Sequence, residues 1–154
     1  MQNNDNIYKR GKIYAIRSPH TEKYYIGSTT SPYLSKRLSG HRMKYKLFMR
    51  NESHYMTSFE LFKLGDEYIE LIENCSCDNV NELCKREGEL IRQYKDNIFN
   101  KFIPDRTQKE YVSLPIQREK HKKHANEKIK CNIDGCDILF ARAYKSIHNK
   151  KFHN

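Results

Sequence analysis

Short runs of β-branched and aromatic residues, separated by polar turns, dominate the first part of the chain. Residues 11–17 (GKIYAIR) and 24–28 (YYIGS) form two such runs, and the polar segment 18–23 (SPHTEK) lies between them. Two strand-like runs this close together predict an antiparallel β-hairpin. Residues 68–73 (YIELIE) form a third run and predict a third strand.

Apolar residues at helical spacing predict three helices between and after these strands. The first covers residues 31–47, where Ser31 is a favourable N-cap and a proline follows at the first helical position. The second covers residues 56–64, and the third covers residues 79–94, where Asn79 begins a sequence typical of a capping box. The order β-β-α-α-β-α predicts a small α+β domain with a three-stranded antiparallel sheet flanked by helices.

The apolar pattern ends near residue 103. Residues 104–129 contain two prolines, many charged residues and few apolar ones, so no hydrophobic core is expected there. We therefore predict a domain at 1–103, a basic linker at 104–129 and a separate small module at 130–154.

Charge adds a prediction about the partner. The chain has 154 residues, with 29 Lys and Arg against 19 Asp and Glu, and a formal net charge of +10. Residues 1–100 account for +3 of this charge and residues 101–154 for +7. A surplus of this size favours a polyanionic partner, nucleic acid ahead of an anionic membrane.

Composition also excludes several classes of protein. No run approaches the roughly 18 apolar residues that a membrane-spanning helix needs, and residues 1–12 lack the apolar stretch of a secretory signal. The five cysteines are an odd number for a disulfide framework. We therefore expect thiols or metal ligands in a reducing compartment, inside the cell in the nucleus or cytoplasm. The richness in Lys, Asn, Ile and Tyr is compatible with an A·T-rich genome, such as that of a virus.

Five residues have the chemistry that phosphodiester cleavage needs. Tyr14 and Tyr25 lie on the two paired strands, and Arg37 and His41 are four residues apart, on one face of the first helix. Glu87 lies among the apolar positions of the third helix, where a carboxylate is costly to bury unless it is paired or holds a metal. An arginine neutralises phosphate charge, an acid holds a divalent cation, and histidine or tyrosine transfers protons.

Each of these residues also has an ordinary structural explanation. The two tyrosines could pack on the sheet, as strand aromatics often do. Arg37 and His41 could lie on a solvated face of a basic helix. Glu87 could be exposed beside its basic neighbours if the helix were rotated by one position.

The segments GKIYAI, YYIGST, SKRLSGH, KREGEL and FNKF, in this order and spacing, resemble the motifs of the GIY-YIG endonucleases. The resemblance covers roughly residues 7–103. Lys12 stands where the first tripeptide of that family has glycine, although Gly11 precedes it. The resemblance implies a GIY-YIG-type fold and an enzyme that hydrolyses DNA phosphodiester bonds with one divalent ion, Mg²⁺ or Mn²⁺.

The resemblance also implies a role for each site residue. Tyr14 would act on the attacking water as phenolate or proton acceptor, and Tyr25 would help to position that water and the phosphate. Arg37 would face the scissile phosphate, with His41 as proton relay or base partner.

Two further roles follow from the same resemblance. Glu87 would bind the catalytic ion, and Asn100 in FNKF would brace the site. Some family members carry another histidine after the first helix, which makes His54 a further candidate.

One site per domain implies one nick per encounter, by a monomer or a transient dimer.

A second chemical signal lies near the end of the chain. It has the spacing C-x4-C-x11-H-x4-H and consists of Cys131, Cys136, His148 and His153. The pattern resembles a C2H2 zinc finger, because two thiolates and two imidazoles suit a closed tetrahedral Zn²⁺ site. About 25 residues cannot fold on their own core, so zinc would supply the folding energy. The alternative is an unfolded basic tail with scattered cysteines and histidines.

The predicted finger has candidate core and contact residues. Phe140, Tyr144 and Ile147 are expected to form its miniature core. Its basic side chains, such as Arg142 and Lys145, favour phosphate contacts.

Three cysteines are left over. Cys75, Cys77 and Cys84 lack a clear fourth ligand and are expected to be ordinary thiols.

Two functional classes compete with a DNA endonuclease tethered to DNA by a zinc finger. One is a catalytically inactive DNA-binding module built on a nuclease fold. The other is a zinc-dependent protein-interaction factor, in which the finger binds a protein.

Overall fold

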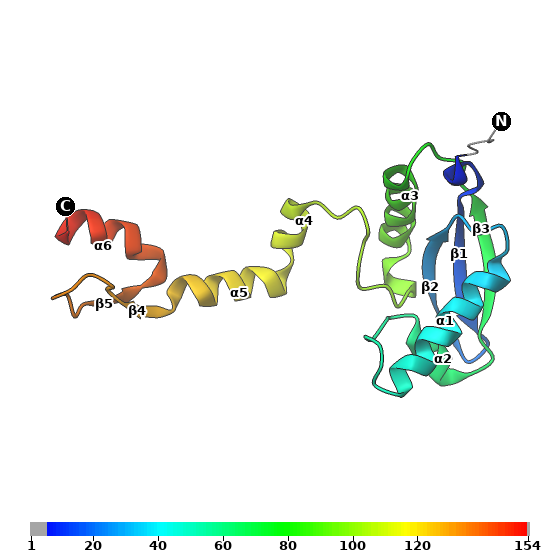
Figure 1. Ribbon diagram of the computed structural model, residues 1–154, viewed down its shortest axis with the longest axis horizontal. Helices are drawn as coiled ribbons and strands as arrows, with labels where there is room; N and C mark the ends of the chain where they lie inside the picture. Colours follow the sequence, from blue (N-terminus) through cyan, green and yellow to red (C-terminus); the bar gives the residue numbers. More distant parts are fainter. Residues whose placement is uncertain (1–5, 154) are drawn as a thin grey trace. The chain divides into compact units, whose positions relative to one another are not determined.

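The computed structural model describes residues 6–153. The chain divides into two compact units, Met1–Asp105 and Arg106–Asn154 (Figure 1). Most of the segment predicted as a linker, residues 104–129, therefore belongs to the same unit as the predicted finger.

The N-terminal unit confirms the predicted order of elements and the predicted α+β fold. Its three strands form one antiparallel sheet in the order β2-β1-β3, so that β1 is central. The elements in chain order are η1 (Ile7–Arg10), β1 (Lys12–Ser18), β2 (Thr21–Thr29), α1 (Leu34–Met49), α2 (Phe59–Leu64), β3 (Tyr68–Asn74), α3 (Val80–Gln93) and η2 (Lys95–Asn97).

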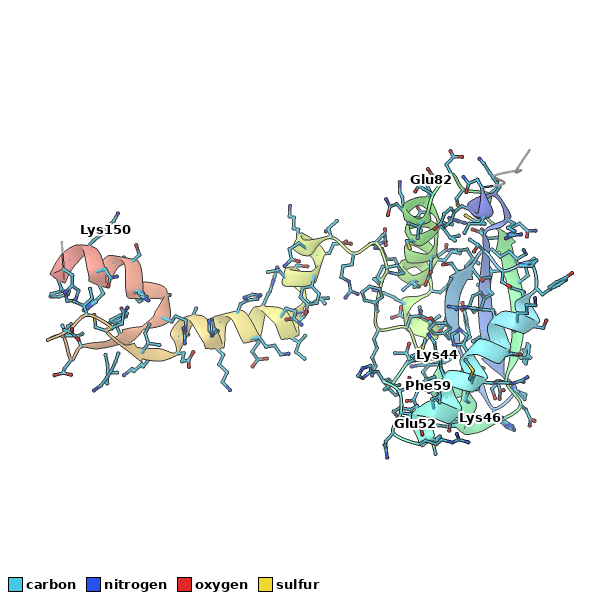
Figure 2. The ribbon with its side chains drawn as sticks, viewed as in Figure 1. Lys44, Lys46, Glu52, Phe59, Glu82 and Lys150 are labelled. Atoms are coloured by element: carbon cyan, nitrogen blue, oxygen red, sulfur yellow. The ribbon has the colours of Figure 1, made fainter. Side chains whose placement is uncertain are left out.

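Helices cover both faces of this sheet because alternate side chains of the central strand point to opposite sides. Ile13 and Ala15 pack with residues of α3, whereas Tyr14 and Ile16 pack with residues of α1 and α2 (Figure 1). Phe59 of α2 is fully buried in the second of these clusters (Figure 2). The strand β2 lies at one edge of the sheet, between the helices of the two faces.

The helix starts agree with the sequence at α3 and differ from it at α1. The Asn79 side chain accepts a hydrogen bond from the Glu82 backbone N–H at 3.1 Å, as predicted for a cap, and Figure 2 labels Glu82 in the first turn of α3. The predicted N-cap Ser31 is wrong, because α1 begins at Leu34 with Tyr33 as its N-cap. The Ser31 hydroxyl donates to the carbonyl of Tyr33 at 3.1 Å, so it acts as a local donor rather than as the acceptor that a helix start needs.

The C-terminal unit begins with helices and ends with a small ββα arrangement. Residues 108–126 form two helices that bury none of their residues, consistent with the lack of a core predicted there. Its elements are α4 (Gln108–Ser113), α5 (Pro115–Asn126), β4 (Lys128–Lys130), β5 (Leu139–Ala141), η3 (Arg142–Tyr144) and α6 (Lys145–Phe152). Within residues 6–153, no helix combines the length and the apolar character that crossing a membrane requires.

Candidate active site and candidate metal centre

Four polar side chains form a hydrogen-bonded chain on the α1 face of the sheet. Nε of Arg37 donates to the Tyr14 hydroxyl at 2.8 Å, and the same hydroxyl lies 2.8 Å from Nε2 of His41. Nδ1 of His41 lies 3.1 Å from the hydroxyl oxygen of Ser58. Arg37 and His41 reach the same phenol because they are one turn apart on α1. The structure thus brings together three of the residues singled out in the sequence and adds Ser58.

Burial determines the protonation states of Tyr14 and His41. Tyr14 and Ser58 are fully buried and His41 is 2% exposed. Burial raises the pKa of Tyr14 to about 12, although the Arg37 guanidinium opposes the shift. Burial lowers the pKa of His41 to about 3, and the charges of Arg37 and Lys44 add to this shift. At neutral pH the phenol therefore keeps its proton and the imidazole is neutral.

The second tyrosine of the hairpin lies beside the same histidine. The rings of Tyr25 and His41 are 5.6 Å apart between centroids, with an interplanar angle of 67°. Burial raises the pKa of Tyr25, and the neighbouring Tyr14 and Glu87 add to the increase. Tyr25 is therefore a protonated phenol at the edge of the cluster.

Glu87 approaches the cluster from α3. It is buried, and its Oε2 accepts a hydrogen bond from the Ser28 hydroxyl at 2.5 Å. Burial raises the pKa of Glu87, while the Ser28 hydroxyl and the Arg37 charge oppose the increase. The Glu87 charge in turn raises the pKa of Tyr14 and of Tyr25, so the carboxylate belongs to the same electrostatic environment as the cluster.

The donor set around Glu87 fits a hard divalent cation. Mg²⁺ is typically held by one or two carboxylates together with waters and substrate phosphates, rather than by a complete protein cage. Glu87 is a carboxylate without an arginine or lysine ion pair in the described part of the chain. A bound cation would offset the burial that disfavours its charged form.

Asn100 is hydrogen-bonded to the backbone of β2. Its side chain accepts a hydrogen bond from the Ile26 backbone N–H and donates to the Ile26 carbonyl, both at 2.8 Å. A backbone hydrogen bond from Phe99 to Tyr24 adds to this pairing. Asn100 therefore acts like part of an additional strand at the free edge of β2, which carries Tyr25.

Other residues from the sequence analysis lie outside the cluster. His54 is exposed in the segment between α1 and α2. Cys75 and Cys77 are free thiols with sulfurs 3.2 Å apart, and Cys84 is a free, half-buried thiol of α3. They remain ordinary thiols in our interpretation.

Two serines of the site were missed in the sequence. Ser28 directly follows the YIG tripeptide, so its position next to a motif was a usable signal. Ser58 carries no signal of this kind, because only the packing of α2 against α1 brings it to His41.

Gly27 leaves room for the buried phenol. It lies opposite Tyr14 in the β1–β2 register, and a Cβ added to Gly27 would lie 2.5 Å from the Tyr14 hydroxyl oxygen. Gly27→Ala should therefore lower the free energy of unfolding by about 1–3 kcal/mol, because the fully buried Tyr14 has little room to move. Urea denaturation measures this change.

A second glycine provides the matched control. A Cβ added to Gly40, inside α1, would meet nothing within 4 Å. Gly40→Ala should raise the free energy of unfolding by up to about 1 kcal/mol, because alanine favours helix more than glycine does. Equal stability losses in the two variants would contradict the proposed contact between Gly27 and Tyr14.

The C-terminal unit holds a second cluster, in which all four predicted zinc ligands converge. Their ligand atoms lie within 4.8 Å of one another. Sγ of Cys131 is 3.3 Å from Nε2 of His153, and Sγ of Cys136 is 3.5 Å from Nε2 of His148. The two Nε2 atoms are 3.2 Å apart. Tetrahedral bonds of about 2.3 Å to sulfur and about 2.0 Å to nitrogen separate S and N by about 3.5 Å, and two N by about 3.3 Å.

Local structure explains how this spacing works. Gly135, with φ of 80°, shapes the turn between the two cysteines. His148 lies within α6, whereas His153 is the residue that caps its C-terminus, with φ of −135°. Because the backbone leaves helical geometry at His153, the two histidines can bring their imidazoles together although they are five residues apart.

The predicted miniature core of this unit is only partly correct. The Phe140 ring stacks on His148, with centroids 4.3 Å apart, and Phe152 lies 5.1 Å from the same imidazole. Tyr144 and Ile147 are each 59% exposed, so their assignment to the core is wrong. Aromatic packing therefore centres on His148, whereas Tyr144 of η3 and Ile147 of α6 are exposed.

A comparison with protein families matches residues 10–102 to the GIY-YIG catalytic domain, and this range includes all six site residues predicted from the sequence. The chain therefore belongs to the GIY-YIG family, whose members are nucleases. No curated protein and no solved structure matched the chain. The family match ends before Cys131, so the Cys/His cluster rests on its geometry alone.

Proposed function

We propose that this protein is a metal-dependent DNA endonuclease that cleaves phosphodiester bonds at the cluster of the N-terminal unit. The observation that carries the proposal is the hydrogen-bonded chain from Arg37 through Tyr14 to His41 in a GIY-YIG domain, with the buried Glu87 coupled electrostatically to Arg37. A cluster that served only to stabilise the fold would not need a neutral, buried imidazole next to a phenol and a guanidinium.

The protonation of the cluster gives each residue a role. Tyr14 accepts a proton from the attacking water and passes its own proton to Nε2 of His41. Its raised pKa makes a resting phenolate unfavourable, so relay fits better than permanent ionisation. Arg37 uses Nε to hold the phenol, and its two NH₂ groups can face the phosphate charge. Tyr25 orients the water at the same edge.

Glu87 is the proposed ligand of the catalytic ion, Mg²⁺ or Mn²⁺. A bound divalent ion supplies Lewis-acid stabilisation of the charge that develops on the phosphate. Ser28 holds the carboxylate in place through its hydroxyl, and Asn100 braces the strand on which Tyr25 stands.

The C-terminal unit is the proposed tether. With Zn²⁺ held by the Cys/His cluster, it would present a folded surface rich in positive charge: residues 106–154 contain 12 Lys and Arg against 5 Asp and Glu. Phosphate contacts from such a surface raise the local concentration of the catalytic unit on DNA. Lys150 of α6 is one of these side chains (Figure 2).

The test is the nicking of supercoiled plasmid DNA by the full chain. We expect nicked circles in Mg²⁺ and no cleavage in EDTA, because without a divalent ion the Glu87 carboxylate repels the phosphate instead of holding a charge-stabilising cation. Nicks should accumulate before linear DNA does, because residues 6–153 hold one such cluster. DNA binding without cleavage in Mg²⁺ or Mn²⁺ would instead establish the inactive DNA-binding module.

A further inference from the structure

Ser58 lies where a helix cap is expected but does not serve as one. It occupies the N-cap position of α2, and its side chain makes no capping hydrogen bond. The residue is fully buried, and its hydroxyl oxygen lies 3.1 Å from Nδ1 of His41. The hydroxyl is therefore used at the active-site cluster instead of at the helix that carries it.

The direction of each hydrogen bond follows from the groups that cannot accept one. An arginine guanidinium is a donor only, so the Tyr14 oxygen accepts from Arg37. The hydrogen of the Tyr14 hydroxyl is then directed to Nε2 of His41, 2.8 Å away. A neutral imidazole has one N–H, and with Nε2 as acceptor that N–H must be at Nδ1, facing Ser58.

We propose that Ser58 is a positioning residue, whose oxygen accepts the Nδ1–H of His41 and so keeps the Nε2 lone pair directed at Tyr14. The opposite tautomer would direct two N–H donors, from Arg37 and His41, at one phenol oxygen, and Nδ1 would then accept from the Ser58 hydroxyl. The ring of Phe62 stacks on His41, with centroids 6.4 Å apart and an interplanar angle of 14°, and limits the rotation of the imidazole.

The consequence for catalysis rests on the proposed nuclease function. The water O–H bond breaks as its proton moves to Tyr14, and the Tyr14 O–H bond breaks as that proton moves to Nε2. The new oxygen–phosphorus bond forms as the bond to the leaving oxygen breaks, and the leaving oxygen takes a proton from solvent. His41 is then an imidazolium, and its hydrogen bond to Ser58 becomes charge-assisted and stronger.

The tautomer is tested first in the resting wild-type protein. Long-range ¹H–¹⁵N NMR spectra distinguish an imidazole protonated at Nδ1 from one protonated at Nε2, and His41→Gln identifies which signals belong to His41 among the seven histidines. We expect a single Nδ1–H tautomer. A proton on Nε2 would overturn the inference whether or not the protein cleaves DNA.

The variant Ser58→Ala then tests the serine itself. We expect the Nε2–H tautomer to appear, and kcat for nicking to fall about 10- to 100-fold at unchanged KM, because the lost hydrogen bond is one that strengthens in the transition state. Ser58→Cys, which keeps a weak acceptor of similar shape, should lie between wild type and alanine. An unchanged tautomer in both variants would refute the positioning role.

Ser18 provides the matched control. It is also a buried serine, 3% exposed, and its hydroxyl donates to the carbonyl of Gly65 at 3.0 Å, away from the cluster. Ser18→Ala should lower stability and leave the His41 tautomer and kcat unchanged. Equal losses of kcat in Ser18→Ala and Ser58→Ala would show a general effect of stability and refute the inference. Absence of cleavage by the wild type would overturn the proposed function, whereas the wild-type tautomer tests Ser58 separately.

Discussion

Replacing Glu87 with alanine is expected to abolish plasmid cleavage, with a fall in the single-turnover rate of at least about 1,000-fold, because the carboxylate is the proposed protein ligand of the ion that stabilises the transition state. Affinity for duplex DNA should change little, since the proposed phosphate contacts of the C-terminal unit would carry most of the binding. Nicking rates in Mg²⁺ measure the first effect, and fluorescence anisotropy with labelled DNA measures the second. Normal cleavage by Glu87→Ala would refute the site assignment.

The near-isosteric Glu87→Gln separates loss of charge from loss of packing. Burial raises the pKa of Glu87, so folding favours its protonated form, and above the ordinary carboxyl pKa the charged form lowers the free energy of unfolding. Glutamine removes this cost. Glu87→Gln should therefore be inactive yet at least as stable as the wild type at pH 7, and its advantage should shrink as the pH falls toward the ordinary carboxyl pKa. Glu89→Gln, at an exposed carboxylate in the same helix, is the active control.

Replacing Cys136 with serine is expected to remove bound zinc and to unfold residues 128–153. Structural zinc contributes about 10–16 kcal/mol in small fingers, and the packing around His148 cannot replace that amount. Metal analysis should find one zinc ion per wild-type chain and almost none in the variant. Backbone NMR signals of residues 128–153 should collapse toward unfolded positions, while those of the N-terminal unit stay unchanged.

A control variant and a DNA-binding measurement complete this test. Cys84→Ser changes a half-buried thiol of the N-terminal unit and should keep the zinc and the spectrum of residues 128–153. If the C-terminal unit is the tether, Cys136→Ser should weaken DNA binding and reduce its salt dependence, because an unfolded segment presents its charges less favourably. Unchanged DNA affinity would favour a protein-binding role for this unit. A folded, zinc-free variant would contradict the metal site.

The sequence alone determined most of the architecture, because the relevant signals are local. Runs of β-branched residues specify the three strands, and Asn79 specifies the start of α3 through a hydrogen bond within one turn. The Cys/His spacing likewise predicted the ligand cluster, since the ligands are at most 22 residues apart in a short segment. The prediction at Ser31 failed although it was also local, because the same hydroxyl can donate to a nearby carbonyl as easily as it can cap a helix.

Only the tertiary structure decided how the site is held together. The bond between Ser28 and Glu87 joins residues 59 positions apart, and that between His41 and Ser58 joins elements that meet through packing. Burial, which raises the pKa of Tyr14 and lowers that of His41, depends on the helices that cover both faces of the sheet. Periodicity in the sequence shows which residues share a face, whereas proton positions depend on distances and desolvation that exist only once the faces are packed.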